Sequence, residues 1–273
     1  MESQEDTLEI SELYDTFHKI SNSKYNEGNK QNKISKEKKK NNFDPDKKSH
    51  FINVPIEDHG FLTNYCLLCE DIKLASLEHF YPELLQKPGK LHMTICVLDL
   101  GQDKEKIDKV HNIMTNLTKE ILQIANGQIY FNFESFECMG KESSARVIYA
   151  KMKEDENYER LMDIVHMIIK ALVDEGVLEK SKLSEYHINY DKQKERYWIK
   201  LHLTLLNVTF LNKIMKKKKE KTLRSINAQK ILNFMNNNSL PTASIEKIHF
   251  SRMREDKQTE RYEMVYSYSL NEL

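Results

Sequence analysis

Two short segments of this sequence repeat the same pairing of a histidine with a threonine. Residues 90–95 read KLHMTI and residues 200–205 read KLHLTL, so His92 and Thr94 correspond to His202 and Thr204. Side chains at i and i+2 of a strand share a face, so each copy presents an imidazole and a hydroxyl on one face and aliphatic residues on the other. A buried sheet face explains the aliphatic residues. It does not explain the repeated histidine and threonine.

A pair of histidines can supply a base and an acid together, because imidazole titrates near pH 6.5. Beside a phosphodiester, one of His92 and His202 would take a proton from the attacking water or hydroxyl, and the other would protonate the leaving oxygen. The hydroxyls of Thr94 and Thr204 would donate hydrogen bonds to the nonbridging phosphate oxygens. The repeat therefore predicts one site for phosphodiester cleavage without a metal or cofactor. It does not assign which histidine is the acid.

Metal binding is the rival use of two histidines. It needs at least one further ligand, and the repeated hexamer contains no carboxylate, so the ligand would have to come from a distant segment. The sequence has no G-x-S-x-G motif, and its seven glycines form neither a P-loop nor a Rossmann fingerprint. Cys66 and Cys69 form a C-x-x-C in an apolar run without a second pair at zinc spacing, which favours reduced structural thiols.

The elements that must position the repeat follow from hydrophobic periodicity. Helices are predicted over residues 61–76, 77–86, 107–124, 161–172 and 225–237. Strands are predicted over residues 50–56, 90–100, 128–138, 145–153, 198–210, 243–253 and 261–270. Nearly the same succession of strands and helices is used twice, and each copy of the hexamer lies in a strand. We therefore expect two pseudo-symmetric halves whose equivalent strands meet at a common cleft.

Composition divides the chain near residue 50. Residues 21–49 are mostly Asn, Lys and Ser, which bury too little apolar surface to offset the entropy of ordering. Ahead of them, residues 8–20 carry an apolar stripe typical of a short amphipathic helix, which would either pack on its own domain or bind a protein partner. The sequence thus predicts a mostly disordered Lys/Asn-rich head over residues 1–49 and one folded domain over residues 50–273.

Charge and hydropathy exclude several classes of protein. The 273 residues contain 42 Lys plus Arg and 42 Asp plus Glu, so no overall field would draw the chain to nucleic acid or to an anionic membrane. No run of about 18 apolar residues and no secretory signal pattern occurs, so we expect an intracellular protein that does not enter a membrane. The Lys-rich runs 36–40 and 215–221 are either solvated charge or nonspecific phosphate contacts.

The paired motifs, about half a domain apart, resemble those of the two-histidine (2H) phosphoesterase superfamily. Residues 49–62, 90–100, 147–165 and 200–210 are similar to the phosphoesterase region of activating signal cointegrator complex subunit 1 and to the nucleotide-binding domain of an A-kinase anchoring protein. The resemblance runs from about His50 to the C-terminus and is looser after Phe210. The cointegrator subunit carries an RNA-binding KH domain before this region, whereas this chain contains no G-x-x-G.

The resemblance implies an α+β, bilobal LigT-like fold with the two H-x-T motifs facing each other across the central cleft. It implies action on RNA ends or on 2′,3′-cyclic or 2′,5′-linked nucleotides, with His92 and His202 as acid and base and with Thr94 and Thr204 binding phosphate. A non-catalytic nucleotide-binding or scaffold subunit, of the coactivator or kinase-anchoring type, stays open as the alternative. The sequence leaves nucleus or cytoplasm open, and a nuclear location rests on the resemblance only.

Overall fold

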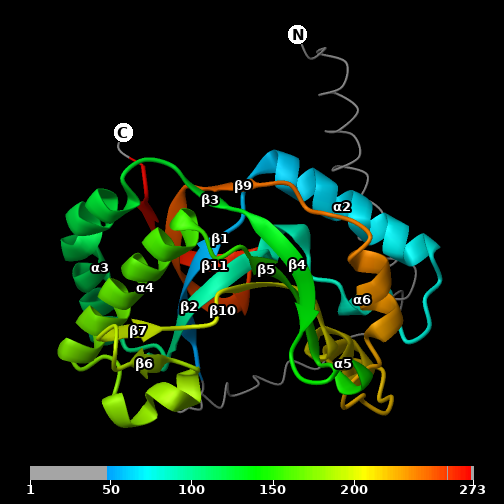
Figure 1. Ribbon diagram of the computed structural model, residues 1–273. Coiled ribbons are helices and arrows are strands. Elements are labelled where there is room, and N and C mark those ends of the chain that lie inside the picture. The colour runs from blue at the N-terminus through cyan, green and yellow to red at the C-terminus, as the bar shows by residue number, and fades with distance from the viewer. Residues whose placement is uncertain (1–47, 257, 272–273) are drawn as a thin grey trace. The chain divides into compact units, whose positions relative to one another are not determined.

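The computed structural model describes residues 48–256 and 258–271, in which helices and antiparallel strands are mixed along the chain as expected of the α+β class (Figure 1). The head over residues 1–49, with the helix expected at 8–20, lies outside the described residues except for Lys48 and Ser49. Ser49 already contacts the domain. Its hydroxyl oxygen accepts hydrogen bonds from the backbone nitrogens of Leu100 at 3.2 Å and Gly101 at 2.8 Å.

A seven-stranded antiparallel sheet carries both copies of the repeated hexamer. Its spatial order is β11 (Tyr262–Ser269), β10 (Lys247–Glu255), β1 (His50–Pro55), β2 (His92–Leu98), β8 (His202–Asn207), β5 (Val147–Met152) and β4 (Phe133–Cys138). Two smaller sheets pair β3 (Ile129–Phe131) with β9 (Ala243–Ile245), and β6 (Asn189–Asp191) with β7 (Arg196–Trp198). The repeated strands β2 and β8 are therefore neighbours in the middle of one sheet.

The helices gather in two groups beside this sheet. They are α2 (His59–Leu74), α3 (Lys104–Ala125), α4 (Glu156–Asp174), α5 (Val208–Lys217) and α6 (Gln229–Met235). In Figure 1, α3 and α4 lie side by side on the left, and α2 and α6 lie on the right. The strands β1, β10 and β11 flank β2, and β5 and β4 flank β8. The two halves thus meet at the β2–β8 pair.

Short polar side chains fix where the helices begin. Asp58, Asp103 and Asp155 accept hydrogen bonds from first-turn backbone nitrogens of α2, α3 and α4. Such caps satisfy donors that have no partner inside the helix. At the other end of α3 the left-handed cap residue is Asn126, with φ 43°, and Gly127 follows it with φ 93°.

Four predicted elements differ from the structure. The helix predicted over residues 77–86 is wrong, because the chain forms turns there and only a short 3₁₀ helix over Pro82–Leu84. Proline disfavours helical backbone in the residue before it, and Tyr81 is extended with φ −130° and ψ 128°.

The strand predicted over 128–138 is interrupted at Asn132, so β3 and β4 belong to different sheets. The strand predicted over 243–253 is interrupted at Glu246, so β9 and β10 belong to different sheets. The strand predicted over 198–210 is too long. Asn207 accepts a hydrogen bond from the backbone nitrogen of Thr209 at 2.8 Å and starts α5.

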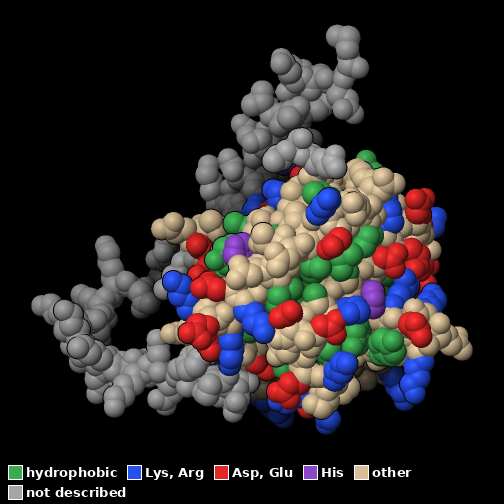
Figure 2. Space-filling model, turned by 90° about the vertical axis from the view of Figure 1, so that its left-hand side faces the viewer, with side chains coloured by type: hydrophobic (Ala, Val, Ile, Leu, Met, Phe, Trp, Pro, Cys, Tyr) green, Lys and Arg blue, Asp and Glu red, His purple; other side chains and the backbone are tan. Residues whose placement is uncertain are grey.

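Acidic and basic side chains are interspersed on the face of the molecule shown in Figure 2, in keeping with the balanced composition. No helix in the described part of the chain is long and apolar enough to cross a membrane. The four cysteines are free thiols. Burial raises the pKa of Cys66 to about 11 and that of Cys69 to about 12, which suits the expected structural role.

Candidate active site

The pairing of β2 with β8 brings the two H-x-T motifs together. The strands are antiparallel and Met93 pairs with Leu203. This register places His92 opposite Thr204 and Thr94 opposite His202, all on the sheet face that Met93 and Leu203 do not occupy. Directly opposed side chains of such strands have Cβ atoms only about 5 Å apart. The four predicted site residues therefore form one patch.

The burial of side chains alternates along both strands as predicted. The aliphatic residues are almost completely buried, at 2 % exposure for Leu91, 0 % for Met93, 3 % for Leu201 and 0 % for Leu203. The side chains of His92, Thr94, His202 and Thr204 are only partly buried. Within the described part of the chain, neither threonine hydroxyl is used in a hydrogen bond to protein, so both can donate to a ligand.

Both imidazoles are held in the same way. The Nδ1 atom of His92 lies 2.7 Å from the carbonyl oxygen of Lys90, and Nδ1 of His202 lies 2.7 Å from the carbonyl oxygen of Lys200. A carbonyl oxygen only accepts, so each Nδ1 carries the hydrogen and donates it. Each neutral ring then keeps its lone pair on Nε2, where it can take or return a proton.

The surroundings of the two rings disfavour their charged form. Burial lowers the pKa of His92 to about 4, although its bond to the Lys90 carbonyl works in the opposite direction, and the charge of His202 lowers it further. Burial also lowers the pKa of His202, and the carbonyl of Lys200 again opposes the shift. Both rings are therefore neutral at pH 7 in the free protein.

A tyrosine ring supports each histidine. Beside His202 lies Tyr149 of β5, with ring centroids 5.4 Å apart and planes at 72°. The ammonium of Lys200 lies 4.8 Å from the centre of the Tyr149 ring, and the Tyr149 hydroxyl donates to Glu137. Edge-on aromatic contacts and a cation over a ring face are both favourable.

The other half repeats this arrangement with residues from another part of the chain. Tyr262 of β11 lies beside His92, with ring centroids 5.3 Å apart and planes at 84°, and Lys90 lies 5.4 Å from the Tyr262 centroid. Phe51 of β1 packs against both rings, 5.2 Å from His92 and 4.9 Å from Tyr262. Sequence analysis missed Tyr149 and Tyr262, because both lie outside the repeated hexamers.

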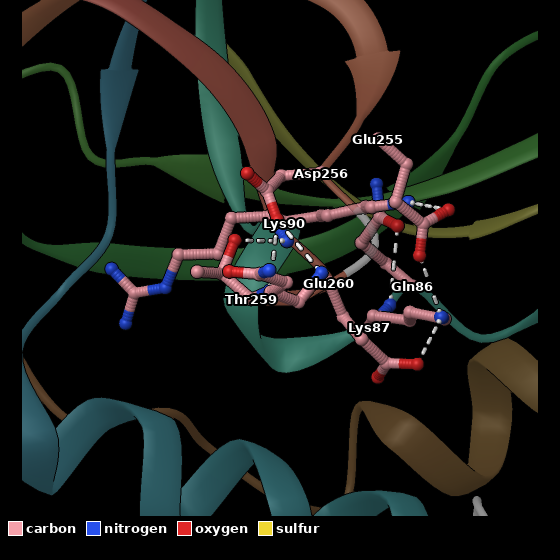
Figure 3. A network of polar contacts seen from close by, with 9 residues as sticks. Gln86, Lys87, Lys90, Glu255, Asp256, Thr259 and Glu260 are labelled. Carbon is pink, nitrogen blue, oxygen red and sulfur yellow. Dashed lines mark hydrogen bonds and ion pairs between the residues drawn. The ribbon is translucent and has the colours of Figure 1, made fainter.

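Ion pairs hold the β10–β11 hairpin against the segment that precedes β2. Glu255 lies 2.6 Å from Lys90 and 2.9 Å from Lys87, and Glu260 lies 3.0 Å from Lys87 (Figure 3). The pairing of β10 with β11 shifts register before Glu255, which pairs with Tyr262. The curled hairpin thus brings Tyr262 to His92, although two strands separate β11 from β2 in the sheet.

A cavity of about 440 Å³ opens beside His92. Its walls come from β1, β10, β11 and the segment before β2, and they include Asn53, Ser251, Ser267 and Tyr262. Neither His202 nor Thr204 belongs to its lining. The cavity therefore lies on the His92 side of the paired motifs. Within residues 48–256 and 258–271, no group of three His, Cys, Asp or Glu side chains is placed to hold a metal ion.

Two H-x-T motifs on neighbouring strands of the central sheet of an α+β domain define the class of two-histidine phosphoesterases. Residues 48–270 match the family model described as AKAP7 2′5′ RNA ligase-like domain. The chain belongs to this family. No curated protein sequence gives a significant match.

Solved structures with low sequence identity also match the chain. Escherichia coli LigT complexed with 3′-AMP is 12% identical, with a TM-score of 0.39, covering 82% of this chain and 99% of that one. A Thermus thermophilus protein is 13% identical, with a TM-score of 0.44 and coverage of 82% and 100%. Kluyveromyces marxianus Usb1 with uridine monophosphate is 8% identical, with a TM-score of 0.41 and coverage of 82% and 97%.

Proposed function

We propose that this chain is a metal-independent phosphodiesterase that acts on RNA ends or on 2′,3′-cyclic or 2′,5′-linked nucleotides. The observation that carries the proposal is the matched anchoring of His92 and His202, each by a 2.7 Å bond from Nδ1 to the carbonyl two residues earlier. An arrangement repeated in this detail on adjacent strands suits two groups that act on one phosphate. The family description, with its 2′,5′ RNA ligase-like domain, supports an RNA-related substrate.

The reaction on a 2′,3′-cyclic phosphate would proceed as follows. The oxygen of a water molecule bonds to phosphorus while the bond from phosphorus to one ribose oxygen breaks. The neutral histidine accepts the proton of the water at Nε2, and the protonated histidine donates its proton to the leaving ribose oxygen. Thr94 and Thr204 donate hydrogen bonds to the nonbridging oxygens, which stabilises the charge that builds up there.

One observation favours the alternative of nucleotide binding without turnover in a scaffold or regulatory subunit. The pKa values of both histidines are lowered, so the free protein at pH 7 lacks the protonated partner that the reaction needs. A bound phosphate would supply a negative charge beside the rings and raise both pKa values. Enzyme and binding module therefore differ in whether a bound phosphodiester raises the pKa of one ring enough for that ring to take a proton from solvent, and is then cleaved.

The decisive experiment incubates the purified chain, with a chelator present, with 2′,3′-cyclic nucleotides, 2′,5′-linked dinucleotides and short RNAs. Turnover by the wild-type chain that disappears in His92→Ala and His202→Ala supports the phosphodiesterase. Binding of nucleotides without turnover of any substrate supports the binding module. Turnover that survives both substitutions and disappears with the chelator contradicts the proposed mechanism.

A nuclear location forms a separate part of the proposal, checked by imaging the tagged full chain in cells.

A further inference from the structure

The two H-x-T motifs are alike in their own geometry but unlike in what lies next to them. Each histidine has an anchoring carbonyl, a tyrosine and a lysine. The cavity of about 440 Å³ is lined by His92 but not by His202. A phosphate bound between the motifs would therefore lie at the mouth of this cavity. One ester substituent of that phosphate would have the cavity to occupy.

The charges around the cavity indicate that this substituent carries no second anionic group. The basic residues of its lining already have carboxylate partners. Lys90 lies 2.6 Å from Glu255, while Arg261 and Lys247 lie 2.8 Å and 3.3 Å from Glu57. A second phosphate group would thus find its cations already engaged, and a buried charge without a partner is costly.

The cavity floor offers neutral hydrogen-bonding groups instead. Asn53 and Ser251 are buried, at 3 % and 2 % exposure, and both belong to the lining. The Asn53 amide nitrogen donates to Ser251 Oγ at 3.2 Å and to the carbonyl of His249 at 3.3 Å. Among the described contacts, this leaves the Asn53 carbonyl oxygen as an acceptor and the Ser251 hydroxyl hydrogen as a donor for a ligand.

The walls offer apolar and aromatic surface. Tyr262 and Met264 of β11 belong to the lining, and the Met264 side chain is 52 % exposed. Small-molecule sites commonly have volumes of about 300–1,000 Å³ and combine apolar walls with a few convergent polar groups. A planar heterocycle on a hydroxylated sugar fits this combination of a polar floor, an apolar wall and Lys and Arg side chains that already have carboxylate partners.

We infer that the cavity beside His92 receives the nucleoside of the substrate, so that a nucleotide binds with its base and sugar over β1, β10 and β11 and its phosphate between the H-x-T motifs. The second ester substituent then leaves the phosphate on the β8 and β5 side. This inference rests on the proposed function in that the phosphate site is the same. It adds the direction in which the substrate lies.

The chain offers a matched pair of substitutions for the test. Ser267 and Ser269 are exposed serines two residues apart on β11, and only Ser267 belongs to the lining. Ser267→Phe fills the cavity from its wall, whereas Ser269→Phe places the same ring outside it. Calorimetry would measure the Kd of adenosine, guanosine, cytidine and uridine monophosphates, and of inorganic phosphate, for the full chain and both variants.

We expect Ser267→Phe to raise the Kd of at least one nucleoside monophosphate about tenfold or more, while Ser269→Phe leaves it within about twofold of wild type. Inorganic phosphate should bind both variants as it binds wild type, since it needs only the H-x-T motifs. Should Ser267→Phe fail to fold, Met264→Trp narrows the same cavity from an exposed position. Equal nucleotide affinities in wild type and the cavity variants, or wild-type nucleotide binding no tighter than that of inorganic phosphate, overturn the inference.

The outcomes separate this inference from the proposed function. Turnover that requires both histidines but does not respond to Ser267→Phe or Met264→Trp would leave the phosphodiesterase standing and remove the nucleoside cavity. Nucleotide binding that depends on Ser267 without any turnover would leave the cavity standing and remove the phosphodiesterase.

Discussion

At the scale of single residues, two histidines with the same anchor differ in their environment. His92 packs against both Phe51 and Tyr262, and burial lowers its pKa to about 4. His202 contacts one tyrosine, and burial lowers its pKa from the ordinary value as well. The carbonyls that fix each Nδ1 hydrogen leave Nε2 as the nitrogen that exchanges protons. Different surroundings of two otherwise matched groups are what a division into acid and base requires.

The pH dependence of turnover should reflect these lowered pKa values. One histidine is protonated and the other neutral only between the two pKa values, and both lie below 6.5 in the free protein. We therefore expect kcat/KM for a 2′,3′-cyclic nucleotide to follow a bell-shaped curve with its maximum below pH 6.5. The maximum of kcat should lie at higher pH, because the bound phosphate stabilises the imidazolium. A kcat/KM maximum above pH 7 would contradict the lowered pKa values of His92 and His202.

Substitutions at the motifs should separate acid–base groups from phosphate-binding groups. His92→Ala and His202→Ala should each lower kcat by about 10²-fold or more, and the double variant should lose much less than the product, because the pair acts as a unit. Thr94→Ala and Thr204→Ala remove one hydrogen-bond donor each and should be milder.

The exposed His79 serves as the control, with His79→Asn expected to leave the rate unchanged; Asn tolerates its positive φ of 64°. Steady-state kinetics in the presence of a chelator measures all of these variants. Additive losses from the two histidine substitutions would show that they act independently.

At the scale of elements, strand neighbours decide what surrounds the motifs. β5 pairs with β8 and places Tyr149 beside His202. Tyr262 lies beside His92 because the β10–β11 hairpin bends where its register shifts. β1 lies between β10 and β2 and carries a buried histidine, His50, which is 1 % exposed. Ser49 Oγ lies 2.8 Å from His50 Nδ1, and Nε2 has no partner within the described residues.

The burial of His50 should make stability depend on pH. Burial, assisted by the charge of Arg252, lowers the pKa of His50 to about 4, below the ordinary 6.5. Between these values the unfolded chain binds more protons than the folded one, so the free energy of unfolding falls as the pH is lowered through this range. At pH 5 the contribution of one such histidine to this loss is about 2 kcal/mol.

Replacing His50 with Gln removes that titration. Urea unfolding at pH 7 and pH 5 should show a smaller loss of stability on acidification in His50→Gln than in wild type, with His79→Asn behaving like wild type. The same loss in all three proteins would place the effect elsewhere.

At the scale of the whole molecule, the site belongs to the domain that begins near β1. The H-x-T motifs, both tyrosines and the cavity all lie between β1 and β11, and Lys48 and Ser49 contact the domain just before it. Lys48 and Ser49, the described part of the head, do not belong to the lining of the cavity. Composition alone predicts that the head does not pack into a core.

Removal of residues 1–47 should therefore leave turnover of a small cyclic nucleotide within about twofold of the full chain. The cut precedes Lys48 and thus keeps the contacts of Ser49 with Leu100 and Gly101. Steady-state kinetics and thermal unfolding of both proteins check the prediction. A large loss of rate with an unchanged unfolding temperature would show that the head takes part in the site.

The sequence by itself determined the residues that meet at the centre of the site. A hexamer repeated in two strands predicted that His92, Thr94, His202 and Thr204 share one place and that Leu91, Met93, Leu201 and Leu203 are buried, because the faces of a strand alternate every residue. Local patterns of this kind also located α3 and α4. They failed over 77–86, where Pro82 outweighs the apolar spacing, and after Asn207, whose side chain caps α5.

Only the tertiary structure decided what stands next to the repeat. Tyr149 and Tyr262 play equivalent parts, yet one lies between the two hexamers and the other near the end of the chain, and neither is embedded in a repeated segment. The cavity beside His92 likewise depends on strand order and on the curl of the β10–β11 hairpin. Pairing between strands distant in sequence sets both the positions of the two tyrosines and the cavity. A local pattern of residue types does not determine which strand will be the neighbour.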